Sequence, residues 1–410
     1  MKPEEIKKTL IDELGQLGPK ERVLIIPPDF TRFHSYAGQL TEWAWEYYGE
    51  KVKGILPALG THTGMTSKQI KKMFGKIPEE LFIVHNWRED VVTLGEVPGS
   101  YVKELTEGKL DFSWPVQVNK LLVEGDWDLI LSIGQVVPHE VVGMANHNKN
   151  IFVGTGGAEG INKSHFIGAV YGMERMMGRA DTPVRRVFNY GSEHFANDLP
   201  IYYALTVVSK GGVKGLFCGF DMKCFEEAAD LALQENFQLL DAPLKKVLVY
   251  LDPEEFKSTW LGNKSIYRTR MAMADDGELI VIAPDLVEFG EDKEIDRLIR
   301  KYGYRGTSST LESVKTNPEL ANNLSAAAHL IHGSSDGRFS IRYCPGKKDG
   351  NLSKEEIESV GFEWGDIDEY LAKYPLNEMN TGMNNINGEE LFYIDNPALG
   401  LWSSKDKFEK

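Results

Sequence analysis

Cysteine is scarce in this chain. Only three of its 410 residues are cysteines, at Cys218, Cys224 and Cys344. They form no Cys-x-x-Cys pair, and their spacing matches no thiolate zinc motif. The sequence therefore supports neither a disulfide framework nor a cysteine zinc site, and it fits a reducing compartment such as the cytoplasm.

Long apolar runs and an excess of positive charge are also missing. No stretch of about 18 apolar residues occurs, and the charged segment Met1 to Lys8 has no apolar core of signal-peptide length. We therefore expect no membrane span, no export signal and a cytoplasmic location. The formal net charge of -15 disfavours nucleic acid or an anionic membrane as a partner. A local basic pocket can still bind an anionic small molecule.

The composition is that of a folded protein. Hydrophobic residues make up 42% of the chain and charged residues 26%, which is ordinary for a globular protein. A chain of 410 residues exceeds what one core normally serves, so we expect two domains.

Strand-like and helix-like segments alternate through the first half of the chain. This alternation predicts a mostly parallel sheet covered by helices. The predicted strands are 23–26, 54–59, 81–85, 128–133, 202–208 and 215–219, and the predicted helices lie at 40–48, from Thr66, from Pro183 and at 222–235.

The pattern restarts near Gln238–Lys245 and indicates a second α/β series. Its predicted strands are 246–251 and 278–282, and its predicted helices are 266–274, 293–302 and 320–330. We therefore predict two α/β domains, 1–243 and 244–410, with a cofactor and substrate cleft between them. The C-terminal tail is expected to pack back on the first domain. The Asn- and Gly-rich stretch 377–388 is predicted to be a loop, and a lid is one interpretation of it.

Polar residues follow three of the predicted strands. Asp29 and Arg32 follow the first, His62 the second and His139 the strand predicted at 128–133. Ligands of open α/β sheets bind beyond the carboxyl ends of the strands, so we expect these four side chains to face one cleft. A single histidine at a strand end is most often an ordinary loop residue. A second histidine at a strand end, together with the glycines around His62, favours a ligand-binding or catalytic site.

Lys149 and His165 flank a glycine-rich stretch at 154–160. Lys149 is either simply solvated or a nucleophile or anion clamp. His165 can ligate a metal through one ring nitrogen, although no His-Glu-x-x-His motif surrounds it. The glycines fit the pattern Gly-x-Gly-x-x-Gly poorly because the third is one residue late, so a dinucleotide fold is only weakly indicated.

Together these motifs resemble the lactate racemase family, whose members use a nickel-pincer nucleotide. Ten residues separate His139 from Lys149 and sixteen separate Lys149 from His165, which agrees with the family spacing. Weaker similarity extends to about residue 225. The matching segments are Asp29-Phe30-Thr31-Arg32, Gly60-Thr61-His62, Gly134 to His139, Lys149, Asn162-Lys163-Ser164-His165, Pro183-Val184-Arg185 and Phe217-Cys218-Gly219.

The resemblance implies a role for each matching residue. Lys149 would be joined covalently to the cofactor, and His165 would be the protein ligand to nickel. His62 and His139 would be paired acid/bases on opposite faces of a 2-hydroxy acid, which is inverted by hydride transfer through a 2-keto acid. Asp29, Thr31 and Arg32 would bind the cofactor, and Arg32 can also hold a substrate carboxylate. The implied partners are the small-molecule substrate and the proteins that make the cofactor.

One segment departs from the family pattern. Lactate-specific members have a Gln and a Lys after a Tyr in the second domain, but here Arg268 replaces the Gln and Met271 replaces the Lys. The resemblance then implies a rebuilt carboxylate site with Arg268 or Arg270 as the cation, although a solvated helix face is equally compatible. We therefore expect a racemase or 2-epimerase of a sugar acid or another extended hydroxy acid. The alternatives are lactate racemase proper, a nicotinamide-dependent 2-hydroxy acid dehydrogenase, and a non-catalytic nucleotide- or metal-binding protein.

Overall fold

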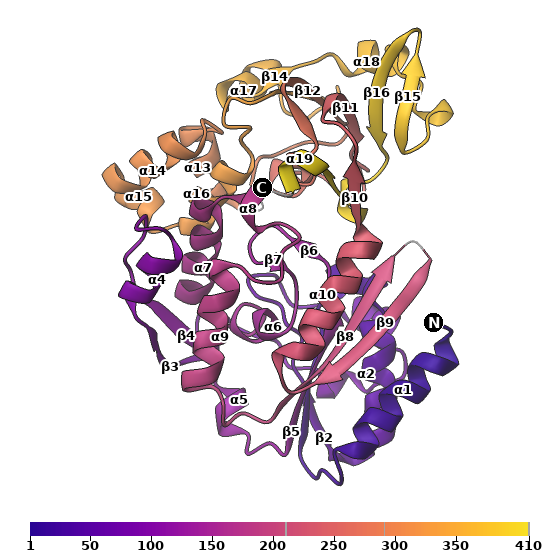
Figure 1. The fold of residues 1–410 in the computed structure, drawn as a ribbon, viewed down its shortest axis with the longest axis vertical. Coiled ribbons are helices and arrows are strands. Elements are labelled where there is room, and N and C mark those ends of the chain that lie inside the picture. Colours follow the sequence, from indigo (N-terminus) through magenta and orange to yellow (C-terminus); the bar gives the residue numbers. More distant parts are fainter. Residues whose placement is uncertain (210, 291, 409–410) are drawn as a thin grey trace. The chain divides into compact units, whose positions relative to one another are not determined.

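The chain folds into two compact units, each built of helices and strands. The structure is a computed structural model that describes residues 1–209, 211–290 and 292–408. Unit 1 contains Met1–Tyr171 and Met176–Asn236, and unit 2 contains Gly172–Arg175 together with the chain from Phe237 onward. Figure 1 follows the chain through these units by colour. The predicted α/β fold class is confirmed.

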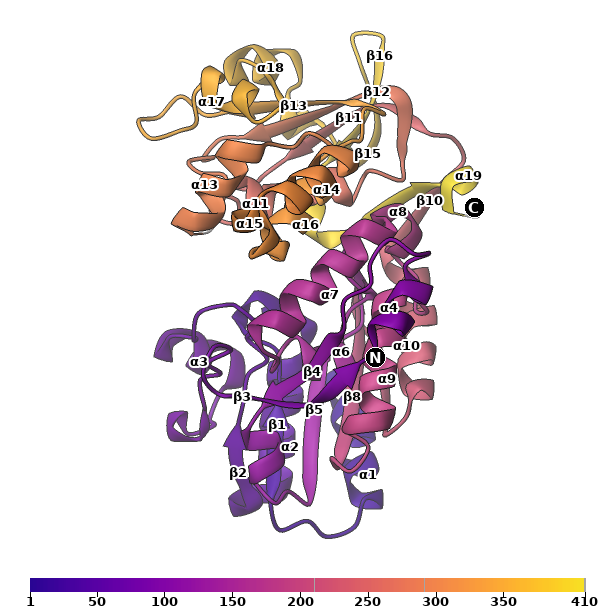
Figure 2. The same cartoon turned by 90° about the vertical axis from the view of Figure 1, so that its left-hand side faces the viewer.

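Unit 1 is organised around a five-stranded sheet in the order β2-β1-β5-β8-β9. The first four strands are parallel and β9 is antiparallel to β8. Figure 2 shows β2, β1, β5 and β8 next to one another. The strands are β1 Val23–Ile26, β2 Val52–Ile55, β5 Leu129–Gln135, β8 Ile201–Ser209 and β9 Gly212–Gly219.

Helices cover both faces of this sheet. Val23 and Ile25 of β1 pack in a core with α1, α2 and α3, whereas Leu24 and Ile26 pack in another core with α7, α9 and α10. Because successive side chains of a strand point to opposite faces, an unbroken apolar strand is the expected sequence of a sheet covered on both sides. The helices of unit 1 are α1 Pro3–Gln16, α2 Ala37–Tyr48, α3 Ser67–Phe74, α4 Gly99–Leu105, α5 Leu121–Glu124, α6 Asn148–Phe152, α7 Ala158–Tyr171, α9 Pro183–Phe195 and α10 Met222–Asn236.

Short elements complete unit 1. The antiparallel pairs are β3 Val91–Val97 with β4 Trp114–Asn119 and β6 Pro138–His139 with β7 Gly143–Met144. The 3-10 helices are η1 Phe30–Ser35, η2 Gly49–Lys51 and η3 Glu79–Leu81. The short helix α8 Met173–Met176 follows α7, and all of it except Met176 belongs to unit 2.

Unit 2 has a six-stranded sheet in the order β14-β13-β12-β11-β16-β15, parallel except for the β15–β16 hairpin. Its strands are β11 Leu244–Tyr250, β12 Met273–Ala283, β13 Ser340–Pro345, β14 Glu363–Trp364, β15 Gly382–Ile386 and β16 Glu389–Ile394. Its helices are α11 Thr259–Gly262, α12 Lys264–Tyr267, α13 Lys293–Tyr302, α14 Thr307–Thr316, α15 Pro318–Ala321, α16 Leu324–His332, α17 Lys354–Ser359, α18 Ile367–Lys373, α19 Lys405–Phe408, η4 Leu376–Glu378 and η5 Pro397–Leu399.

The C-terminal segment forms a separate parallel pair, β10 Phe237–Leu240 with β17 Leu401–Ser404. The sequence placed the end of the first domain at residue 243, whereas the contacts divide the chain between Asn236 and Phe237. The C-terminal strand β17 thus pairs with β10. The sequence pattern assigned β10 to the first domain, whereas the contacts assign it to unit 2.

Three local predictions are wrong. The helix expected at 266–274 ends at Tyr267, because Met273 already pairs with β11 as the first residue of β12. The strand expected at 81–85 is reduced to one bridge between Ile55 and Phe82. The loop expected at 377–388 contains β15, which turns into β16 through Asn387 and Gly388, both with positive φ. An Asn-Gly pair at that position is a hairpin signal.

Candidate functional site

The candidate residues of unit 1 lie where the parallel strands end. η1 follows β1, His62 follows β2, and the β6 strand with His139 follows β5. A bridge between Pro28 and Ala58 holds the first two segments together, and the Gly60 amide donates to Gly154 O at 2.8 Å. The carboxyl edge of the sheet and the glycine-rich stretch therefore meet.

Asp29 and His62 form a hydrogen-bonded dyad. The Asp29 Oδ2 atom lies 2.6 Å from His62 Nδ1, and its Oδ1 atom accepts hydrogen bonds from the amide and hydroxyl of Thr31. Burial would raise the pKa of Asp29, but the hydrogen bonds from His62 and Thr31 outweigh it and hold that pKa below its ordinary value. An ionised carboxylate only accepts, so Nδ1 carries the proton and Nε2 of the half-exposed His62 is left as an acceptor.

His139 has the opposite arrangement. Its buried ring accepts a hydrogen bond at Nδ1 from the Val141 amide at 3.1 Å, and an amide can only donate. Burial holds the pKa of His139 well below its ordinary value, and the charges of Lys149, Arg32 and His165 act in the same direction. The neutral ring therefore carries its proton on Nε2. One histidine presents an acceptor and the other a donor.

Lys149 presents an unpaired amine. It is the second residue of α6, and among residues 1–209, 211–290 and 292–408 no group hydrogen-bonds or ion-pairs with its Nζ atom. Removal from bulk water, followed by the charge of Arg32, lowers its pKa to about 8. An amine with such a pKa is partly unprotonated near neutral pH and can act as a nucleophile.

The ring of His165 is fixed through one of its two nitrogens. On α7, its Nδ1 atom donates to Ile161 O at 2.7 Å, which leaves the lone pair of Nε2 available. Burial lowers the pKa of His165 to about 4, so the ring stays neutral. The described part of the chain holds no cluster of three or more His, Cys, Asp or Glu side chains suited to a metal. A metal on His165 would therefore need ligands from a cofactor.

Electrostatics connect the separate residues into one site. Lys149, Arg32, His165 and Glu140 all act on His139, and Asp29 acts on Lys149. The structure thus brings together the unit 1 residues that the sequence singled out. Glu140, whose Oε2 atom lies 3.8 Å from His139 Nδ1, was missed, because a glutamate after a histidine gives no signal of its own.

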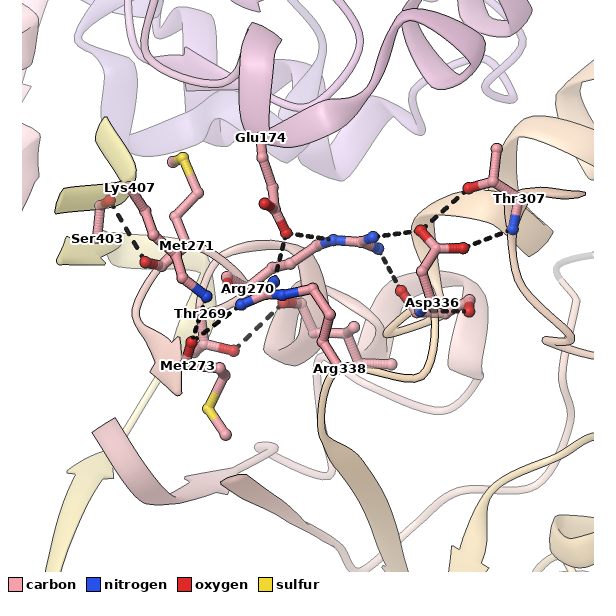
Figure 3. A network of polar contacts seen from close by, with 12 residues as sticks. Glu174, Thr269, Arg270, Met271, Met273, Thr307, Asp336, Arg338, Ser403 and Lys407 are labelled. Atoms are coloured by element: carbon pink, nitrogen blue, oxygen red, sulfur yellow. Dashed lines mark hydrogen bonds and ion pairs between the residues drawn. The ribbon is translucent and has the colours of Figure 1, made fainter. Parts of the chain in front are cut away.

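The two arginines proposed for the substrate belong to unit 2 and are both buried, not on a solvated helix face. Arg270 is fully engaged: it donates to Glu174 at 2.9 Å, to Asp336 at 2.5 Å and to the carbonyl of Ser334 (Figure 3). Arg338 reaches the same Glu174 oxygen at 2.5 Å. Arg268 has one long bond, to Gly400 O at 3.5 Å, and its buried Nε atom has no partner within the described chain.

Comparison with known proteins defines the class of this chain. Residues 6–177 match the model of the lactate racemase N-terminal domain. The lactate racemase of Thermoanaerobacterium thermosaccharolyticum is 25% identical over 284 residues, which are 63% of this chain and 60% of that protein's length. The chain thus matches less than two thirds of this curated relative.

Solved structures share the fold over nearly the whole chain. A crystal structure of a Thermotoga maritima protein has a TM-score of 0.82 at 24% identity and covers 99% of both chains. The lactate racemase apoprotein of Thermoanaerobacterium thermosaccharolyticum has a TM-score of 0.73 at 18% identity and covers 98% of this chain and 93% of that one. The resemblance is confirmed: residues 6–177 carry the N-terminal domain of the lactate racemase family.

In the described part of the chain, none of the helices combines the length and the apolar character needed to cross a bilayer.

Proposed function

We propose that this chain is a racemase or 2-epimerase of a 2-hydroxy acid that works with a nickel-pincer nucleotide. The observation that carries the proposal is the unpaired Lys149 amine beside His139 and His165, in a domain that matches the lactate racemase N-terminal domain. The curated relative is a lactate racemase, so an isomerase is the reaction class that the similarity supports.

The residues fit such a cofactor. Lys149 would hold it covalently, and His165 would offer Nε2 to its metal, because imidazole is a good nickel ligand. Thr31 and Arg32 would contact its remaining polar groups. The chemistry that such a cofactor would supply when bound is reversible hydride acceptance at C2 of the substrate. Proteins that make and load the cofactor are the partners that this proposal requires.

The two histidines would handle the hydroxyl proton. His62, supported by Asp29, starts as the acceptor and takes the proton of the 2-hydroxyl on its side. His139 starts as a donor toward the substrate oxygen on the other face. To deliver a full proton to that oxygen His139 would first have to be an imidazolium, because loss of a proton from the neutral ring would leave an imidazolate, and the nearby Glu140 would stabilise the imidazolium charge. Inversion at C2 would require proton transfer on both faces of a planar 2-keto acid, which a base on each side would allow.

The arginines divide into two groups. In unit 2 we assign the substrate carboxylate to Arg268, because its buried Nε atom has no partner among the described residues, whereas Arg270 is committed to Glu174 and Asp336. A planar arginine in place of the lactate-type Gln favours a longer, polar hydroxy acid. We therefore propose a sugar acid or another extended 2-hydroxy acid as the substrate.

The test combines the mass of the intact protein, nickel analysis and a chiral assay, all after expression with the cofactor pathway. We expect an adduct on Lys149, nickel that is lost in His165→Ala, and activity that rises from lactate through malate to aldonates. A site that hydrogen-bonds substrate hydroxyls rejects analogues lacking them by as much as roughly 10⁴–10⁵-fold. Reduction of a nicotinamide cofactor by a 2-hydroxy acid, without an adduct, would show a dehydrogenase instead.

A further inference from the structure

Arg185 is a buried cation to which the proposed chemistry gives no role. It lies on α9 with 1% of its surface exposed, and the described residues supply no carboxylate that pairs with it. Its guanidinium lies 4.1 Å from the ring centroid of Phe225, and its Nε atom has no hydrogen-bond partner. Burial lowers the pKa of Arg185 to about 9, so the group still carries its charge at neutral pH. An unpaired buried charge is unfavourable for stability, which points to another use.

The Arg185 guanidinium hydrogen-bonds to the segment that precedes Lys149. Its Nη2 atom donates to Met144 O at 2.7 Å, and its Nη1 atom donates to Asn146 O at 3.1 Å and to the side chain of Asn148. The planar fork therefore bridges acceptors on both sides of one turn. A lysine in the same place could not hold this geometry, because it presents a single point of charge.

That turn has a strained backbone. Asn146 has φ 69°, and His147 has φ 57° with ψ -136°. Residues other than glycine rarely adopt such backbone angles. The His147 ring is fixed as well: it stacks on Tyr203 at 3.8 Å, and its Nε2 atom lies 3.2 Å from Asp221 O. Such a conformation persists only where the surroundings hold it, and α6 starts directly after it.

Arg185 also acts on Lys149 through its charge. Removal from water is the main cause of the lowered pKa of Lys149, Arg32 is the next, and Arg185 contributes in the same direction. The arginine thus affects the lysine in two separable ways, by holding the turn and by disfavouring the protonated amine.

We propose that Arg185 is a positioning residue that holds the Met144–Asn148 turn so that the Lys149 amine stays unpaired and directed into the site. The proposal deepens the proposed function, since it rests on Lys149 as the attachment point. Its test needs neither cofactor nor substrate.

The experiment measures Lys149 in the apoprotein by reductive methylation with formaldehyde and cyanoborohydride, followed by peptide mass spectrometry. The exposed Lys68 serves as internal reference. In Arg185→Met we expect the pH midpoint of Lys149 labelling to rise by roughly half a unit, which is about a threefold lower rate at pH 7. Arg186→Met is the matched control, because the next residue of α9 is half-exposed and pairs with Asp181.

Arg185→Lys separates the fork from the charge. The pH midpoint of Lys149 labelling in this variant should stay near that of the wild type. Amide hydrogen exchange in residues 144–149 should become faster than in the wild-type protein, whereas exchange in β8 should not change. This variant decides the question even where Arg185→Met does not fold. Wild-type exchange in Arg185→Lys, or a wild-type labelling profile in Arg185→Met, would overturn the proposal. Neither result depends on racemase activity, so a failure here is distinguishable from a failure of the proposed function.

Discussion

Arg270 of unit 2 and the buried cations of unit 1 differ in how their charge is balanced. In unit 1, Lys149 and Arg185 lack carboxylate partners among the described residues, and their pKa values are lowered to about 8 and about 9. In unit 2, Arg270 is neutralised by Glu174 and Asp336. Buried charges are normally paired because desolvation is costly. Arg270 thus contributes to the stability of unit 2, whereas Arg268 of that unit, like Lys149 and Arg185 of unit 1, is held without a carboxylate partner among the described residues.

The most decisive way to break this comparison is Lys149→Ala. Since the amine has no partner to leave behind, we expect the variant to fold with an unfolding free energy within about 1 kcal/mol of the wild type. It should lose the covalent adduct completely. Intact mass after expression with the cofactor pathway checks the adduct, and urea unfolding checks stability. An adduct of unchanged mass would exclude Lys149 as the attachment point.

The paired histidines come next in expected effect. His62→Ala and His139→Ala should each lower racemisation by roughly 10²–10⁴-fold, the usual contribution of a general acid or base. Isotope exchange at C2 from one enantiomer should survive better in one variant than in the other, since the two rings present opposite tautomers. Chiral chromatography and mass spectrometry measure both. Wild-type racemisation in either variant would disprove the two-base assignment.

In unit 2, substitution of a buried cation should lower the unfolding free energy, unlike Lys149→Ala in unit 1. Arg270→Met leaves Asp336 without its arginine and removes one arginine from Glu174, so we expect a loss of about 2–3 kcal/mol in unfolding free energy, less than for a fully buried pair. Arg186→Met, which removes an exposed pair, should cost less than about 1 kcal/mol. Urea unfolding of both variants makes the comparison. Equal midpoints would mean that the buried pairs do not stabilise unit 2.

The smallest effect concerns pH. The pKa of Asp29 is held below its ordinary value by His62 and Thr31, so its contribution to stability is present at neutral pH and is lost as pH falls through the folded-state pKa. Asp29→Asn should therefore lower stability at neutral pH and flatten the acid limb of the stability curve, so that the curves of the two proteins converge as pH falls below about 4. Thermal unfolding from pH 3 to pH 7 measures this, and parallel curves for both proteins would contradict it.

Sequence patterns predicted the positions of the site residues better than their partners. His62 and His139 could be placed because polar residues after buried strands mark the edge of a parallel sheet. The hydrogen bond between Asp29 and His62 joins residues 33 apart in sequence, and the hydrogen bond from Arg185 to Asn146 O joins residues 39 apart. No local pattern encodes such contacts, since they depend on how the chain packs.

The errors of the sequence reading also have local causes. Residues 266–274 have helical composition, but pairing of Met273 with Leu244 overrides that propensity. The hairpin at Asn387-Gly388 carried a recognisable turn signal, which was outweighed by the polar composition around it. Long strands with clear boundaries, such as β5 and β8, were predicted with small errors at their ends.

The assignment of Gly172–Arg175 to unit 2 has a consequence for folding during translation. Glu174 leaves the ribosome nearly a hundred residues before Arg270 and still earlier than Arg338. At roughly 5–20 residues per second, this delay is several seconds or longer. During that time the glutamate has no arginine of unit 2 to bind. The short helix α8, which follows the helix that carries His165, therefore lacks these ion pairs until the second half of the chain has been translated.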